Sequence, residues 1–156
     1  MKKLILVLSI LLPLSSFCQC PALIGAAPEK VNWLLPQVQN VFGYELKQNA
    51  TPDTKAGLFY IDSLNYTQLR IYTKSSVKYD GVNKIEGPAI VNRILVAGPS
   101  DRAMKFITYL KKELANCEGF RQGGQWIKIK GMSVVYTEYK VESGMPCIRI
   151  DFEIEK

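Results

Sequence analysis

Apolar positions recur every three or four residues between Ser100 and Cys117, which is the spacing of one face of an α-helix. The apolar set consists of Ala103, Phe106, Ile107, Leu110, Leu114 and Cys117. Ser100 is a good N-cap for this helix, and Gly119 suits the left-handed turn that closes a helix. The pattern therefore predicts a helix with one buried stripe that lies on a sheet.

A second helical pattern begins at Pro28 and ends at Gly43, with an apolar stripe from Val31 to Phe42. Pro36 lies inside this pattern, where a proline removes a backbone donor and clashes with the preceding turn. We therefore expect the segment to be kinked or split into two helices.

The segment 90–97 is apolar at odd and even positions alike, which is typical of a strand covered on both faces and predicts the central strand of the sheet. Residues 58–62 and 66–73 form a predicted hairpin, residues 77–79 a short strand, and residues 84–88 lead into the central strand. Three strands are expected after the Ser100 helix, of which residues 148–154 alternate most regularly. Their charges are expected to pair across strands, with Lys128, Lys130, Lys140 and Arg149 facing Glu138, Asp151 and Glu153.

The order helix, strands, helix, strands predicts an α+β fold. We expect a largely antiparallel sheet of about five to seven strands with two helices packed on one face. Residues 20–156 are expected to form a single domain, and no internal repeat is visible in the sequence.

Residues 1–19 have the layout of a secretory signal peptide, with two lysines, an apolar run over residues 4–14 and a short polar segment. The run is too short to span a membrane, so we expect no transmembrane helix in the mature chain. Cleavage fits after Cys18 or after Gln19, and the expected location is the periplasm or the secreted fraction. The alternative is a lipoprotein that is anchored through an acylated Cys20 or Cys18.

An exported chain meets oxidants, so its cysteines are expected to form disulfides. Removal of the leader leaves Cys20, Cys117 and Cys147. We expect a Cys117–Cys147 bridge between the helix end and the last strand, with Cys20–Cys147 as the alternative. One observation counts against the first pairing, because Cys147 shares the outward parity of Arg149 whereas Cys117 belongs to the inward stripe.

The chain carries 20 Lys and Arg residues against 14 Asp and Glu, and its net charge of +6 becomes +4 when Lys2 and Lys3 leave with the leader. Nine basic residues but only three acidic ones lie between Arg70 and Lys112. This excess can attract an anionic polymer. No specific nucleic-acid-binding motif accompanies it.

The chain contains no histidine, which excludes Ser-His and Cys-His nucleophile pairs and zinc sites that need imidazole. No glycine-rich phosphate loop or metal-binding cysteine spacing is present, and we predict no catalytic residue, cofactor or metal. One anion-binding hypothesis remains at the start of the Ser100 helix. There Ser100 and Arg102 lie beside the free amides of the first turn, and Arg93 is set in the preceding strand.

These observations favour an exported, non-catalytic module of the cell envelope or secreted fraction. Its partner is unknown; an envelope protein and an anionic polymer are the two candidates. A small-ligand carrier with a pocket between helix and sheet is an alternative. A hydrolase is another, and it would need two of Glu138, Asp151 and Glu153 across a cleft. Their alternation with apolar residues indicates instead the outer face of a sheet.

Overall fold

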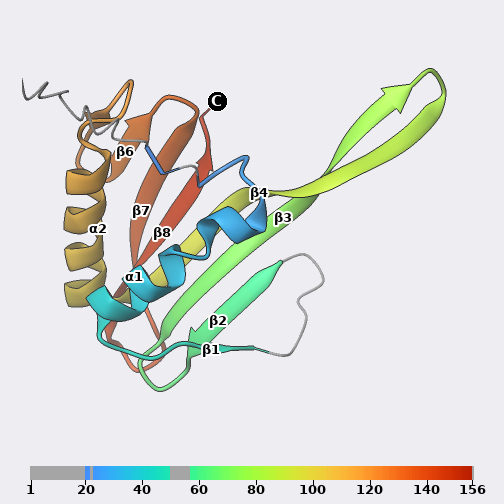
Figure 1. Ribbon diagram of the computed structural model, residues 1–156. Helices are drawn as coiled ribbons and strands as arrows, with labels where there is room; N and C mark the ends of the chain where they lie inside the picture. Colours follow the sequence, from blue (N-terminus) through green and yellow to red (C-terminus); the bar gives the residue numbers. More distant parts are fainter. Residues whose placement is uncertain (1–19, 22, 50–56, 156) are drawn as a thin grey trace, which may run out of the picture.

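The computed structural model describes residues 20–21, 23–49 and 57–155, so the predicted leader over residues 1–19 lies outside the described residues. Figure 1 shows a single antiparallel sheet with two helices on one of its faces, which is the α+β architecture that the sequence predicts. Within the described residues, no helix combines the length and apolar character needed to cross a membrane.

The chain consists of two units, each a helical segment followed by four strands. The first unit contains the 3₁₀ helix η1 (Pro28–Val31), α1 (Leu34–Phe42), β1 (Lys47–Gln48), β2 (Leu58–Asp62), β3 (Thr67–Asp80) and β4 (Asn83–Pro99). The second unit contains α2 (Ser100–Leu114), β5 (Arg121–Gln122), β6 (Trp126–Ile129), β7 (Met132–Lys140) and β8 (Pro146–Ile154).

The strands are ordered β1-β2-β3-β4-β8-β7-β6-β5, and every neighbouring pair is antiparallel. The last strands of the two units therefore meet at the centre of the sheet. The eight described strands exceed the five to seven that we expected. The structure thus repeats one element order twice, although no repeat is visible in the sequence.

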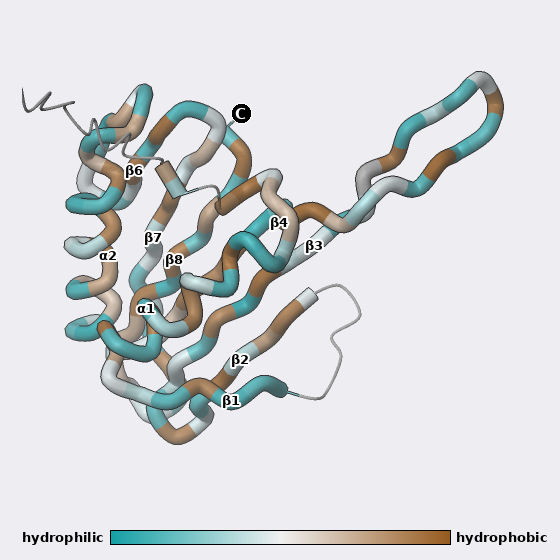
Figure 2. Tube along the Cα trace, in the orientation of Figure 1, coloured by the Kyte–Doolittle hydropathy of each residue, from teal (hydrophilic) through white to brown (hydrophobic). Residues whose placement is uncertain are grey.

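Helix α2 buries the predicted stripe. Its inward side chains are each at most 1% exposed: Ala103, Phe106, Ile107, Leu110 and Leu114. They pack on β4 and β8, which contribute Ile94, Val96, Ile148, Ile150 and Phe152 to the buried core, and both strands carry hydrophobic, brown positions in Figure 2. The prediction for its start was wrong by one position, because Pro99 is the N-cap and Ser100 is already helical, without a side-chain cap bond.

The second helical pattern is split in two, as expected. The break falls at Asn32 and Trp33, between η1 and α1, so Pro36 lies in the first turn of α1. In the first turn a missing backbone donor breaks no helical hydrogen bond. Gly43 ends α1 in the left-handed conformation, at a φ of 75°.

Strand β4 is central, between β3 and β8, as the sequence predicts. Gly98 is required in this strand, because a Cβ there would lie 2.5 Å from the Phe42 ring of α1. Leu95 and Ala97 point away from the helices but are only 5% and 1% exposed. Long side chains on the neighbouring strands cover them, which explains why this strand is apolar at both parities.

Strands β3 and β4 continue beyond the rest of the sheet as a two-stranded arm, residues 74–89, which projects from the body in Figure 1. The sequence predicts a separate short strand over residues 77–79, and residues 84–88 as a lead into the central strand. Instead the pairing runs from Ser75 opposite Ala89 to Asp80 opposite Asn83, with a register shift between Ser75 and Val77. The recorded pairing of β2 with β3 ends at Ile71, and that of β8 with β4 ends at Arg93.

The expected Cys117–Cys147 bridge is wrong. Cys117 is bonded to Cys20, with Cα atoms 5.5 Å apart, and Cys147 is a buried free thiol. The parity of β8 explains the difference, because Cys147 points to the face opposite α2. In this pairing the Cys20 sulfur is occupied by the disulfide, so it cannot also carry a thioether-linked lipid.

Candidate functional site

Side chains on the face of the sheet opposite the helices form three rows that cross up to six strands. Directly paired residues of antiparallel strands project to the same side, so the register defines each row. The first row is Tyr72, Arg93, Glu153, Ser133, Lys128 and Arg121. The second is Phe59, Arg70, Leu95, Asp151, Val135 and Trp126. The third is Lys47, Ile61, Gln68, Ala97, Arg149 and Thr137. We call these rows the helix-free face.

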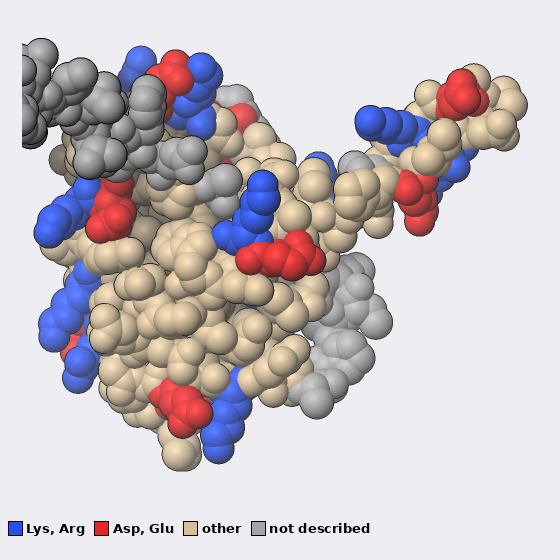
Figure 3. Space-filling model, viewed as in Figure 1, with Lys and Arg blue, Asp and Glu red and all other residues tan. Residues whose placement is uncertain are grey.

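The helix-free face is strongly basic. Its six cationic residues are Lys47, Arg70, Arg93, Arg121, Lys128 and Arg149, against only Asp151 and Glu153. Three aromatic residues, Tyr72, Phe59 and Trp126, lie at the ends of the first two rows. The opposite face differs, because Figure 3 shows basic and acidic side chains scattered together over the helix-covered side.

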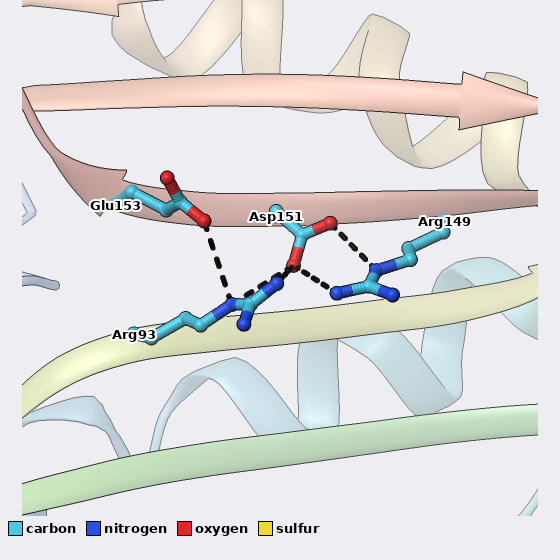
Figure 4. Close-up of polar contacts among 4 residues, drawn as sticks. All are labelled: Arg93, Arg149, Asp151 and Glu153. Carbon is cyan, nitrogen blue, oxygen red and sulfur yellow. Dashed lines mark hydrogen bonds and ion pairs between the residues drawn. The ribbon is translucent and has the colours of Figure 1, made fainter.

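The centre of the face is an ion-pair cluster in which Asp151 lies between two arginines (Figure 4). Arg93 Nη2 donates to Asp151 Oδ1 at 2.6 Å, and Arg149 Nε donates to Asp151 Oδ2 at 2.7 Å. Arg93 Nε also lies 3.5 Å from Glu153 Oε1. The hydrogen bond to Asp151 raises the pKa of Arg149.

This cluster fixes the two guanidinium groups without burying them. The Asp151 side chain is 14% exposed, whereas those of Arg93 and Arg149 are 35% and 43% exposed. Asp151 therefore acts as a positioning residue that holds both guanidinium groups along the sheet. Planar guanidinium groups that still have free donors can bind carboxylate or sulfate groups in two-point geometry.

A depression of about 440 Å³ adjoins the cluster. Leu95 and Ala97 line its buried apolar part, and the polar and aromatic lining is Gln68, Arg70, Tyr72, Thr137, Tyr139 and Arg149. The Arg70 guanidinium stacks 4.3 Å from the centre of the Phe59 ring, and its Nε donates to Gln68 Oε1 at 3.1 Å. This half of the face combines oriented cations with apolar contact area.

A second depression, of about 640 Å³, lies toward the β5–β6 edge. Its lining includes Arg121, Trp126, Lys128 and Val135. Trp126 is 37% exposed there, and large aromatic side chains with one open side serve as stacking platforms. The two depressions flank the centre of the sheet, so cations and aromatic rings lie on both sides of it.

Beside the first depression, Cys147 is buried beneath the sheet surface, next to Tyr139 on β7. Burial raises the pKa of the Cys147 thiol, and a hydrogen bond with Tyr139 partly opposes this. Burial and the neighbouring thiol together raise the pKa of Tyr139. Both groups are therefore neutral, packed members of the sheet at neutral pH.

We expect Cys147 to react with a thiol reagent about 100-fold more slowly in the folded chain 20–156 than in concentrated urea, because both burial and protonation protect it. Spectrophotometric thiol titration measures this, and the unfolded chain should show one thiol. Two or more thiols under non-reducing conditions would contradict the disulfide pairing.

The three residues of the sequence-based anion hypothesis do not lie in one place. Ser100 starts α2, and Arg102 Nε pairs with Asp101 Oδ2 at 3.2 Å. Arg93 lies seven positions before Ser100, roughly 23 Å away along the extended strand β4, and points to the helix-free face. Anion binding by Ser100 and Arg102 stays a prediction.

The predicted charge sets are also rearranged. Asp151 and Glu153 lie on the helix-free face, whereas Glu138, directly paired with Ile148, projects to the other face. Lys130 pairs with Glu118, at 2.8 Å, and not with a strand acid. Of the nine basic residues between positions 70 and 112, only Arg70 and Arg93 belong to the helix-free face; the others lie on the arm or in α2.

Sequence reasoning missed Lys47, Tyr72 and Arg121. Period-two alternation placed Lys128 and Arg149 on the outward side of their strands, but only the strand order brings them together with the other cations of this face. Among the described residues, no group of three or more cysteine or acidic side chains is placed to hold a metal ion. The chain matches no family model, no curated protein and no solved structure.

Proposed function

We propose that the protein is a non-catalytic binding module of the cell envelope or secreted fraction, and that its helix-free face binds an acidic polysaccharide. The observation that carries this proposal is the distribution of charge on that face, six cations against two acids in three rows. A face of one sign attracts a polyanion and raises its association rate.

The chemistry of the face suits carboxylated or sulfated sugars. Arg93 and Arg149 present oriented guanidinium groups, and Trp126 offers an exposed ring in the second depression. The Cys20–Cys117 disulfide is consistent with an oxidising, extracytoplasmic location, where such polymers occur as ligands.

The alternatives have less support. Asp151 and Glu153 both contact Arg93 on an open sheet face, and Glu138 projects to the other side, so these acids do not converge across a cleft as a glycosidase requires. The α2 stripe is packed against the sheet with side chains at most 1% exposed, which does not favour a ligand pocket beneath this helix.

Binding of the chain 20–156 to polygalacturonate, heparin, neutral dextran and single-stranded DNA, measured by calorimetry over a salt series, tests the proposal. We expect binding to one or both acidic polysaccharides that weakens steeply as salt rises, because exposed charges are screened within about 8 Å at physiological ionic strength. No binding to either acidic polysaccharide at low salt, or tighter binding to DNA, would contradict the proposal.

A further inference from the structure

The arm, residues 74–89, is a two-stranded ribbon, and no third strand pairs with it in the part of the chain that the structure describes. Its described side chains are exposed, apart from the half-buried Gly87, and Tyr79 and Ile85 are 72% and 51% exposed. An isolated two-stranded hairpin is marginally stable in water at best. The outer edges of both strands also present unpaired backbone donors and acceptors, which are templates for pairing with another strand.

Each strand of the arm carries a lysine, an apolar residue and an acid in succession. These triplets are Lys78-Tyr79-Asp80 on β3 and Lys84-Ile85-Glu86 on β4. If such a strand pairs antiparallel with a copy of itself about the middle residue, each lysine faces an acid and the two apolar residues face each other. Opposite charges directly across a pair of strands are stabilising, and like charges are destabilising.

We propose that the arm pairs with the arm of a second copy of this chain along the β4 edge, centred on Ile85. Lys84 of one copy then faces Glu86 of the other, twice by symmetry, and the two Ile85 side chains meet. This is an isologous contact, which closes as a dimer because the same edge is used by both copies.

The β4 edge suits this pairing better than the β3 edge. The five paired positions, residues 83–87, all lie within β4, whereas the same span about Tyr79 would include the turn residue Gly81, at a φ of 60°. Asp80 and Asn83 flank a two-residue turn, so they face each other as a hydrogen-bonded pair. Hydrogen-bonded and non-hydrogen-bonded pairs then alternate along the hairpin, which makes Lys84 and Glu86 members of non-hydrogen-bonded pairs. Lys84 and Glu86 therefore direct their N–H and C=O groups outward, toward the second copy.

Pairing of the two arms leaves room for the rest of the sheet and the helices of both copies. Five paired residues occupy about 17 Å of strand, all of it nearer the tip than Ala89. Among the described residues, backbone hydrogen bonds from the N-terminal segment reach β4 only at Val91. There the Gly25 amide donates to the Val91 carbonyl at 2.7 Å, and the Val91 amide donates to the Ala26 carbonyl. The contacts within the body therefore do not compete for the paired edge.

Charge argues against docking of the arm on the helix-free face of another copy. The arm has three lysines and two acids, a net charge of +1, and Figure 3 shows both signs along it. The helix-free face has an excess of four positive charges. Arm against arm instead places every charge of the β4 triplet opposite its counter-charge. Within one strand, Lys84 Nζ lies 2.9 Å from Glu86 Oε1, and the two side chains are 52% and 65% exposed. Both are therefore accessible to form the same ion pairs with the second copy instead.

Sedimentation equilibrium of the chain 20–156 over a concentration series tests the pairing. We expect a reversible dimer, and we expect Lys84→Glu to raise its dissociation constant at least about tenfold, because two Lys–Glu contacts become Glu–Glu contacts. The swap Lys84→Glu/Glu86→Lys should restore the dissociation constant to within about threefold of the wild-type value. Lys78→Glu, on the other edge, is the matched control and should leave it unchanged.

Three results would overturn this pairing. They are a wild-type chain that remains a monomer up to about 1 mM, a charge swap that fails to rescue Lys84→Glu, and a dimer that Lys78→Glu weakens and Lys84→Glu does not. The three variants change only exposed side chains, and melting temperatures equal to that of the wild-type chain would show that they share its fold. Polysaccharide binding by the monomeric variant stays testable, so failure here does not affect the proposed function.

Discussion

Loss of the Cys20–Cys117 disulfide is expected to lower the free energy of unfolding by about 4–5 kcal/mol. The two cysteines are 97 positions apart, so the bond closes a loop that contains most of the chain 20–156 and removes much of the freedom of the unfolded state. Urea unfolding of the oxidised chain 20–156, compared with Cys20→Ser/Cys117→Ser, measures the loss.

Reductant provides the control for this prediction. It should destabilise the wild-type chain to the level of the double serine variant and leave that variant unchanged. The pairing would be contradicted if the unfolding midpoint of the wild-type chain did not change on addition of reductant. A disulfide-linked Cys117–Cys147 peptide found by non-reducing mass mapping would also contradict it. A lipid on Cys20 would likewise appear in the intact mass.

The substitution Phe106→Ala is expected to cost about 3–5 kcal/mol of unfolding free energy, because it leaves a cavity that the neighbouring elements cannot fill. Phe106 is fully buried, and its ring centre lies 6.0 Å from that of Phe42 in α1 and 6.0 Å from that of Tyr109. It therefore links the two helices within the buried core. Calorimetric or urea-induced unfolding measures the loss.

Lys105→Ala is the matched control in the same helix. Lys105 is exposed, so its removal should change the unfolding free energy by no more than about 0.5 kcal/mol. A loss below about 1 kcal/mol for Phe106→Ala would mean that α2 does not pack on the sheet through this stripe.

Local patterns predicted the elements whose burial depends on a single face. The α2 stripe and the alternation of Ile148, Ile150 and Phe152 were predicted correctly, because one helix or strand period decides which side chains meet the core. The arm was not recognised as one hairpin. Gly87 and Pro88 interrupt its pattern, and its exposed strands lack the apolar alternation that marks a buried face.

The site depends on contacts that no local pattern contains. Arg93 and Asp151 are 58 positions apart and meet only because β4 and β8, the last strands of the two units, pair at the centre of the sheet. The same long-range pairing carries Arg121 and Lys128 into the row of Arg93. A one-residue change of register would move a whole strand of these side chains to the helix side.

We propose that the helix-free face of the sheet, and not the net charge of the chain, is responsible for binding the polyanion. Arg70→Gln/Lys128→Gln removes two charges from the helix-free face, and Lys105→Gln/Lys112→Gln removes two from the exposed side of α2, so the variants have equal net charge. Calorimetry against the acidic polysaccharide at low salt compares them directly. We predict about 30-fold weaker binding for the first variant, on the basis of roughly 1 kcal/mol for each lost contact with a polyanionic surface, and less than a twofold change for the second. Equal losses in the two variants would contradict the claim.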